Sequence, residues 1–155
     1  MAGLDISSSI TINRPIAEVS TFAANPENAP RWYKNITAVE WKGAPEVRTG
    51  ARVAFVAKFL GRRLEYTYEI VEWIPNRRLV MRTADGPFPM ETTYEWTGQS
   101  PGVTRMQLRN RGRPSGFSAL LRPVMAFAVK RANAEDLRLL KSLLERENTH
   151  VQNQS

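Results

Sequence analysis

Apolar and polar residues alternate almost without a break from Ile36 to Arg113, and one long helical pattern then runs to about Asn148. Period-two alternation with short breaks predicts consecutive antiparallel strands joined as a meander. Seven strands side by side span roughly 34 Å at about 4.8 Å per strand, whereas a helix with its side chains is only about 10–12 Å across. Either the sheet curls tightly around the helix or space remains between them, and we interpret that space as the functional part.

The segment before the meander predicts a first strand and two short helices. The strand is expected from Leu4 to Ile12. Asn13-Arg14-Pro15 and Asn25-Pro26-Glu27 each carry a helix start signal, because proline is favoured at the first helical position. We expect Pro30 to limit the second helix and Pro123 to bend or restart the terminal helix near its beginning.

The terminal helical pattern predicts one apolar stripe that faces the sheet. Its members are Leu121, Met125, Ala128, Val129, Ala132, Leu139, Leu140 and Leu143. Asp136 interrupts this stripe. If the carboxyl group is buried, its pKa is raised and it becomes a candidate general acid or base. The alternative, which we favour at this point, is that Asp136 faces an opening or pairs with an arginine.

Charge and composition exclude several classes of site. The chain has 22 lysines and arginines against 15 acidic residues, giving a net charge of +7. The basic residues are scattered, which favours a solvated basic surface over a nucleic-acid footprint. Cysteine is absent and the single histidine, His150, lies in the polar tail, so neither a Cys/His zinc site nor a histidine-based triad is expected. We predict no cofactor and no metal.

Location is predicted from what the sequence lacks. The N-terminal residues have neither the basic region nor the apolar core of a secretory signal. No apolar stretch is long enough to span a bilayer. We therefore expect a cytoplasmic protein.

Motifs near both ends resemble one known family. The stretch Ile12-Asn13-Arg14-Pro15-Ile16-Ala17-Glu18-Val19, followed by Phe22, Asn25-Pro26-Glu27-Asn28 and Trp32, resembles the opening of the polyketide cyclase/dehydrase-like group of the START/Bet v 1 (SRPBCC) superfamily. Asp136-Leu137 and Leu140-Lys141, with Leu144-Glu145 beyond, resemble the terminal helix of the same group. The resemblance covers nearly the whole chain.

The resemblance implies an α+β helix-grip fold, in which a curled seven-stranded antiparallel sheet surrounds a long C-terminal helix and two short helices lie near the N-terminus. It implies a single domain over residues 1–148, followed by a polar tail at 149–155. Relatives in this superfamily include carriers of hydrophobic ligands, coenzyme-Q-binding proteins and aromatase/cyclases. The fold therefore does not determine which of these functions the protein has.

The candidate ligand-binding residues are those expected to face the space between the strands and the terminal helix. Wide apolar side chains with a few hydroxyl groups are typical of small-molecule pockets. The set comprises Trp32, Phe55, Phe59, Tyr66, Tyr68, Met81, Thr92, Tyr94, Met106, Leu108, Leu121 and Met125. For any single member, simple core packing is the competing explanation. Buried phenols need hydrogen-bond partners, so the tyrosines are the strongest indication of polar points inside a cavity.

Three functions are compatible with these features. The favoured one is binding of a hydrophobic small molecule (lipid-, polyketide- or aromatic-like) in an internal cavity, as a carrier or sensor. The second is a polyketide cyclase or dehydratase, in which Tyr66, Tyr68 or Tyr94 assists proton transfer or stabilises an enolate. The third is an interaction module whose basic surface binds acidic lipid or nucleic acid. A weak contact with an acidic membrane surface and a homodimer are further partner hypotheses.

Overall fold

The structure is a computed structural model that describes residues 3–113 and 121–152, with side chains described as far as Arg146. It contains the strands β1 (Leu4–Ile12), β2 (Ile36–Trp41), β3 (Arg52–Phe59), β4 (Arg62–Ile74), β5 (Arg78–Asp85), β6 (Met90–Ser100) and β7 (Val103–Gly112). The helices are α1 (Ile16–Ala24), the 3-10 helix η1 (Pro26–Asn28), α2 (Ala29–Trp32) and α3 (Arg122–Gln152).

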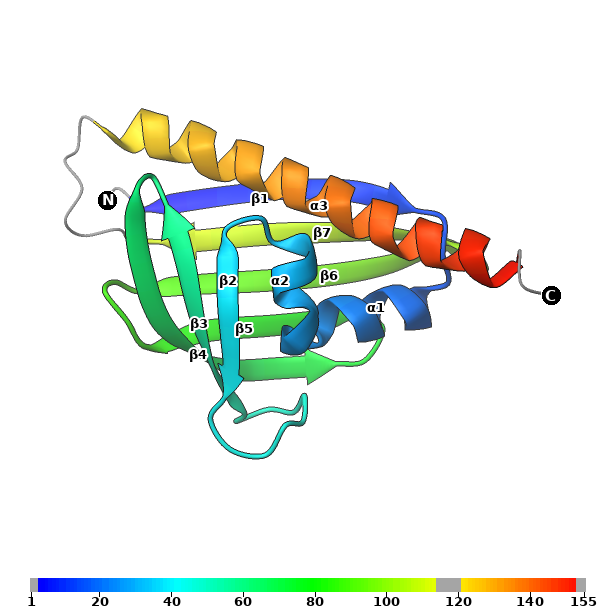
Figure 1. Ribbon diagram of the computed structural model, residues 1–155, viewed down its shortest axis with the longest axis horizontal. Coiled ribbons are helices and arrows are strands. Elements are labelled where there is room, and N and C mark those ends of the chain that lie inside the picture. Colours follow the sequence, from blue (N-terminus) through cyan, green and yellow to red (C-terminus); the bar gives the residue numbers. More distant parts are fainter. Residues whose placement is uncertain (1–2, 114–120, 153–155) are drawn as a thin grey trace.

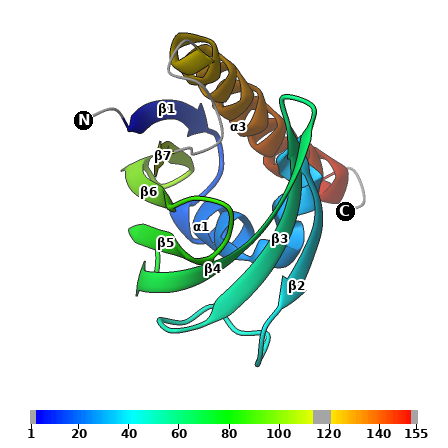
Figure 2. The same cartoon turned by 90° about the vertical axis from the view of Figure 1, so that its left-hand side faces the viewer.

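All strands belong to one antiparallel sheet with the order β1-β7-β6-β5-β4-β3-β2. Strands β2 to β7 pair in chain order, and β1 returns to the far edge beside β7. The register shifts twice between β4 and β5, and such irregularities let a long strand bend. Figure 2 shows the result: the sheet curls into a half-barrel, and α3 lies across its open side near β1. The predicted meander and helix-grip fold are confirmed.

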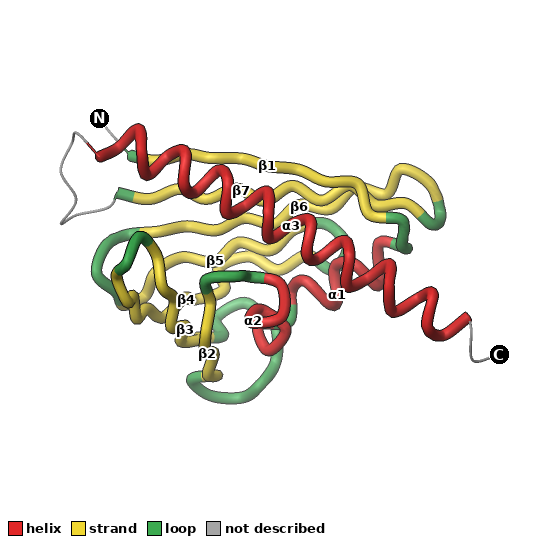
Figure 3. Tube along the Cα trace, turned by 45° about the horizontal axis from the view of Figure 1, so that its top comes forward, coloured by secondary structure: helices red, strands yellow, loops and turns green. Residues whose placement is uncertain are grey.

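The long helix α3 supplies the core residues that cover the sheet (Figures 1 and 3). Leu137, Leu140 and Leu144 are each at most 5% exposed. The predicted stripe was wrong in part, because Leu139 is 37% exposed and Leu121 is 46% exposed. The buried face instead follows Met125, Asn133, Asp136 and the three leucines named above, so it includes polar residues that a purely apolar stripe omits.

The short helices pack against different parts of the fold (Figure 1): α1 contacts β6 and β7, whereas α2 contacts β2 and α3. Asn25 caps η1 by accepting a hydrogen bond from the backbone N–H of Glu27 at 3.1 Å. Pro30 lies in the first turn of α2, so the expectation that it limits this helix was wrong. A proline is tolerated there because the first backbone N–H groups of a helix have no intrahelical partner.

The β3–β4 hairpin closes through Leu60 and Gly61, which have positive φ angles of 50° and 75°. A two-residue turn with positive φ at both positions matches the right-handed twist of the flanking strands. Glycine adopts this conformation without strain, and Leu60 accepts it at some conformational cost. The turn carries Phe59 to one end of the half-barrel, where the cavity described below begins.

Candidate ligand cavity

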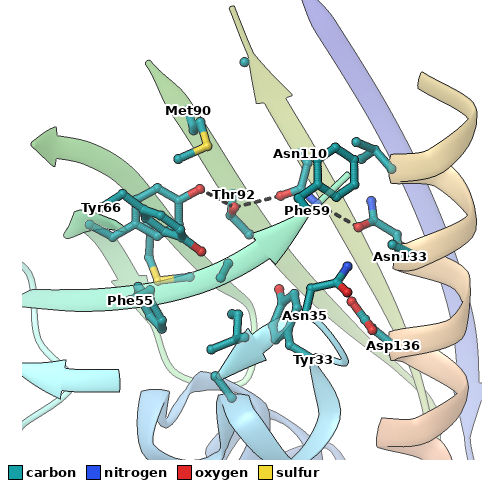
Figure 4. Close-up of a pocket in the computed structure, with 18 of the residues that line it drawn as sticks. Tyr33, Asn35, Phe55, Phe59, Tyr66, Met90, Thr92, Asn110, Asn133 and Asp136 are labelled. Carbon is teal, nitrogen blue, oxygen red and sulfur yellow. Dashed lines mark hydrogen bonds between the residues drawn. The ribbon is translucent and has the colours of Figure 1, made fainter. Parts of the chain in front are cut away.

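A cavity of about 200 Å³ lies between the concave face of the sheet and α3. Its walls come from β3 to β7, from α3, and from the helical segment before β2 (Figure 4). The hollow that the widths of sheet and helix predict is therefore present. It forms because the strands curl too broadly for the side chains of α3 to fill the whole trough.

Most of the predicted binding residues border this cavity. Eight of the twelve predicted residues line it: Phe55, Phe59, Tyr66, Tyr68, Met81, Thr92, Tyr94 and Met125. Seven of them face inward because they share the inward phase of β3, β4, β5 or β6, and Met125 lies on the buried face of α3. Period-two alternation was thus a sufficient signal for the strand residues.

The other predicted residues lie elsewhere. Trp32, Met106 and Leu108 are completely buried, and they pack into the core rather than along the cavity wall. Met106 and Leu108 belong to β7, close to the edge where α3 crosses β1 and where packing is dense. Leu121 comes directly before α3, is 46% exposed and does not line the cavity. A side chain that points to the concave face of the sheet can therefore either line the cavity or pack in the core, and alternation alone does not distinguish the two.

An aromatic cluster forms the wall opposite α3. The ring centroids of Phe55 and Tyr66 are 5.5 Å apart, those of Tyr66 and Tyr68 are 5.0 Å apart, and those of Phe55 and Tyr68 are 5.8 Å apart. These separations are typical of favourable ring pairs. Burial raises the pKa of the Tyr66 phenol well above its usual value, and burial likewise raises the pKa of Tyr68 to about 12. Both phenols therefore stay neutral at physiological pH.

A directed chain of hydrogen bonds crosses from this wall to α3. Thr92 donates its hydroxyl hydrogen to Oδ1 of Asn110 at 2.7 Å, so the 2.9 Å bond between Thr92 and Tyr68 must use the hydrogen of Tyr68. Asn110 donates from Nδ2 to Oδ1 of Asn133 at 2.9 Å. The chain ends at Nδ2 of Asn133, a buried donor with no partner among the described residues (Figure 4).

Asp136 lies one turn further along α3 and also lines the cavity. It is 3% exposed, and its Oδ1 accepts a hydrogen bond from the backbone N–H of Lys34 at 3.0 Å. The favoured expectation, that Asp136 faces an opening or pairs with an arginine, was wrong. Burial raises the pKa of this carboxyl from 3.8 to about 6, because the single backbone hydrogen bond compensates only part of the lost hydration.

Tyr33 and Tyr94 bring their hydroxyl groups together at 2.5 Å beside Asp136. Burial raises the pKa of both phenols above the usual value, and the nearby Asp136 carboxyl adds to the effect. One of the two hydroxyl hydrogens lies in the bond between them. The other has no acceptor among the described residues, so the pair can donate one further hydrogen bond.

Sequence reasoning missed three polar residues of the cavity wall: Asn35, Asn110 and Asn133. Asn110 shares the inward phase of Leu108, which was an available signal. Asn133 lies three residues before Asp136, which places both on one face of α3. Tyr33 and Asn35 lie in the turn between α2 and β2, and no periodic pattern indicates their direction.

The described part of the chain contains no group of histidine, cysteine, aspartate or glutamate residues that could hold a metal ion. Within the same residues, no helix combines the length and the apolar character needed to cross a membrane. The polar side chains that line the cavity among these residues are four phenols, three amides, one threonine hydroxyl, one carboxyl group and the guanidinium of Arg111.

A curled antiparallel sheet, a covering C-terminal helix and a cavity between them define the helix-grip class of proteins. The chain belongs to the family described as "Polyketide cyclase / dehydrase and lipid transport", whose profile matches residues 4–145. No curated protein matches the chain significantly in sequence.

Solved structures share this fold at low sequence identity. The chain is similar to the Zhui aromatase/cyclase from a Streptomyces species, with a TM-score of 0.79, 15% identity, and coverage of 94% of this chain and 95% of that one. It is also similar to the protein TTHA0849 from Thermus thermophilus, with a TM-score of 0.77, 20% identity, and coverage of 89% and 94%. A START superfamily protein from Mycobacterium smegmatis has a TM-score of 0.70, 13% identity, and coverage of 95% and 98%.

Proposed function

We propose that this protein binds a small hydrophobic molecule in the cavity, as a carrier or sensor. The observation that carries the proposal is a cavity of about 200 Å³ whose lining is mostly aromatic and aliphatic, with a few convergent polar groups. Apolar ligand surface gains about 25 cal/mol per Å² when it leaves water. The family description, which includes lipid transport, agrees with such a role.

The cavity volume supports a ligand of limited size. Pockets for drug-sized ligands are typically about 300–1,000 Å³, so about 200 Å³ suits one or two fused rings or a short acyl chain. A longer ligand would have to extend through the mouth, past Phe59, Phe88 and Arg111. Native mass spectrometry of the purified protein, followed by titration with naphthalene derivatives and short fatty acids, tests the proposal. Absence of any binder at micromolar concentration would overturn it.

Filling the cavity should abolish binding without unfolding the protein. We expect Ala132→Phe to weaken binding of a naphthalene probe by at least about 30-fold, because the new ring occupies much of the cavity that Ala132 lines. Calorimetric titration measures the affinity, and thermal unfolding checks the fold. Arg138→Phe is the matched control, since it adds the same ring at an exposed position of α3. Equal affinities for both variants would place the ligand elsewhere.

A second candidate function is a cyclase or dehydratase, and the acid–base groups in the cavity favour it. Asp136 has a pKa of about 6, which is close to the range in which a carboxyl group exchanges protons with a substrate at neutral pH. The neutral hydroxyl of Tyr66 and the remaining hydroxyl hydrogen of the Tyr33–Tyr94 pair would donate hydrogen bonds to an enolate oxygen rather than act as bases, whereas the hydrogen of Tyr68 is already used in its bond to Thr92. The similarity in fold to an aromatase/cyclase is compatible with this candidate.

The enzyme candidate has its own test. If it is correct, the protein converts a linear poly-β-ketone thioester into a cyclised or dehydrated product, and the triple change of Tyr66, Tyr68 and Tyr94 to phenylalanine reduces turnover by at least about 100-fold. Product analysis by liquid chromatography and mass spectrometry measures this, and circular dichroism checks the fold. An unchanged product distribution in the triple variant would remove the proposed role of the tyrosines.

Other partner hypotheses stay predictions. Many basic residues of the convex face pair with acidic neighbours, for example Arg82 with Glu91 at 2.6 Å and Arg109 with Asp5 at 2.6 Å. Such exposed pairs distribute charge of both signs over the outer surface and contribute little stability each. Binding of nucleic acid or acidic membrane, a homodimer and a cytoplasmic location each need a direct measurement.

A further inference from the structure

The polar groups of the cavity are concentrated on the side of α3, and their hydrogen-bonding capacity is incompletely used. Oδ1 of Asp136 is bonded to the backbone of Lys34, whereas Oδ2 accepts no hydrogen bond from the described residues. Nδ2 of Asn133 is a buried donor without a partner among those residues. The Tyr33–Tyr94 pair retains one hydroxyl hydrogen that no described residue accepts. The wall thus combines an open acceptor with open donors.

These groups are close enough to act on one ligand group. Asn133 and Asp136 are three residues apart on α3, which places their Cβ atoms about 5–6 Å from each other on one helix face. Tyr33 and Tyr94, joined through their hydroxyl groups, line the same cavity as Asp136, and Figure 4 shows Tyr33 on the side of the cavity where Asp136 lies. Figure 4 shows Tyr33, Asn35, Asn133 and Asp136 turned toward the same part of the cavity.

The two charged residues that line the cavity among the described residues are Asp136 and Arg111. The side chain of Arg111 is 53% exposed and its guanidinium lies 3.6 Å from the carboxylate of Glu91, so this charge is paired and solvated away from the α3 wall. A ligand carboxylate at this wall would meet the Asp136 carboxyl and could not donate a hydrogen bond to it. An ammonium group would satisfy Asp136 but could not accept from Asn133 or the tyrosine pair.

We propose that the wall formed by Asn133, Asp136 and the Tyr33–Tyr94 pair binds the polar end of the ligand, and that this end is uncharged and carries a hydrogen-bond donor beside an acceptor, as in a carboxamide or a hydroxy ketone. The inference rests on the proposed small-molecule function and specifies the ligand class. The acceptor atom of the ligand receives hydrogen bonds from Asn133 and the tyrosine pair, and its donor reaches Oδ2 of Asp136. The apolar body then lies against Phe55, Tyr66 and Met81.

A matched series of naphthalene probes tests this proposal, because its members differ only at the polar end. β-Ethylnaphthalene has no polar group, β-acetonaphthone has only an acceptor, β-naphthamide has a donor and an acceptor, and β-naphthylmethylamine is a cation. Calorimetric titration at neutral pH should show β-naphthamide binding about tenfold tighter than β-ethylnaphthalene, since each additional hydrogen bond contributes about 0.5–1.5 kcal/mol. The ketone should lie between them, and the amine should not exceed the amide.

Two variants assign the effect to the α3 wall. Asn133→Leu removes the open donor, and Asp136→Asn exchanges the open acceptor for an amide nitrogen while keeping an oxygen for the Lys34 N–H. Each should reduce the preference for β-naphthamide over β-ethylnaphthalene to within about threefold, with binding of the ethyl compound retained. Arg138→Gln, at an exposed position on the same helix, should leave the preference unchanged.

The outcomes separate this inference from the function on which it rests. If β-ethylnaphthalene and β-naphthamide bind equally well to the wild-type protein, the cavity binds apolar molecules but the polar assignment is overturned. Tightest binding of the amine would overturn it in favour of a cationic ligand. If no probe binds, including the purely apolar one, the small-molecule function itself fails.

Discussion

Replacing Asp136 by asparagine should stabilise the protein at neutral pH by up to about 3 kcal/mol, because the carboxyl pKa of about 6 in the folded state is well above its ordinary value of 3.8. Between these two pH values the folded protein holds a proton that the unfolded chain has already released. The contribution of Asp136 to the free energy of unfolding is therefore most favourable below about pH 4. It decreases as the pH rises to about 6 and stays constant above that.

The Asn variant removes this titration while keeping the geometry. Its amide oxygen can still accept the hydrogen bond from the backbone N–H of Lys34. Urea unfolding of both proteins over a pH series gives the two stability curves, and their difference isolates Asp136. The lowered pKa values of Asp5 and Glu145 contribute to both curves in the same way and cancel in the difference.

A control and a contradicting outcome complete this experiment. Glu95→Gln is the matched control, since it removes a carboxylate whose side chain is 47% exposed on the outer face of the sheet. If the difference between wild type and Asp136→Asn does not change with pH, the carboxyl is not held in an apolar setting. This result would contradict the role proposed for Asp136 in binding the polar end of the ligand and its role as an acid or base in the cyclase or dehydratase candidate.

Truncation of Trp32 should be among the most destabilising single changes in the protein. Trp32 is fully buried, with its ring centroid 4.1 Å from that of Tyr33 and 5.7 Å from that of Tyr94. We expect Trp32→Ala to lower the free energy of unfolding by about 3–5 kcal/mol, because it removes a large apolar surface and leaves a cavity. The tyrosine pair beside it would also lose its support.

Trp32→Phe separates the packing of the ring from its polar atom. The indole N–H of Trp32 is buried without a hydrogen-bond partner among the described residues, which is itself unfavourable. Phenylalanine loses some contact area but removes this donor, so we expect a cost below about 1.5 kcal/mol. Chemical denaturation of both variants measures the two values. A large cost for Trp32→Phe would mean that the N–H has a stabilising partner, such as bound water.

Local periodicity determined the strand residues of the cavity, because the concave face of a curled sheet is mostly apolar. Phe55, Tyr66, Met81 and Tyr94 were found in this way, and the structure places each of them on the cavity wall. Whether they bind a ligand stays a prediction. The same rule also selected Met106 and Leu108, which are fully buried in the packed core. Period two reports the direction of a side chain but not the distance to the opposite surface.

The α3 wall could not be predicted to the same degree. The interruption of the stripe by Asp136 was visible in the sequence, yet its burial depended on the turn that carries Lys34 toward the helix from 102 residues away. The hydrogen-bond chain from Thr92 through Asn110 to Asn133 joins two strands and a helix. In the sequence alone, buried polar residues of this kind cannot be distinguished from exposed ones, because their hydrogen-bond partners come from distant segments.

The order and alternation of the elements by themselves determined a seven-stranded meander covered by one terminal helix, since hydrophobic burial fixes which face of each strand turns inward. Only the tertiary structure decided how far the sheet curls, and therefore where the interior is filled and where about 200 Å³ stays open. It also decided that a carboxyl group, an amide and two phenols from distant segments meet at the cavity wall. Curvature depends on packing between elements far apart in the chain, which no local pattern encodes.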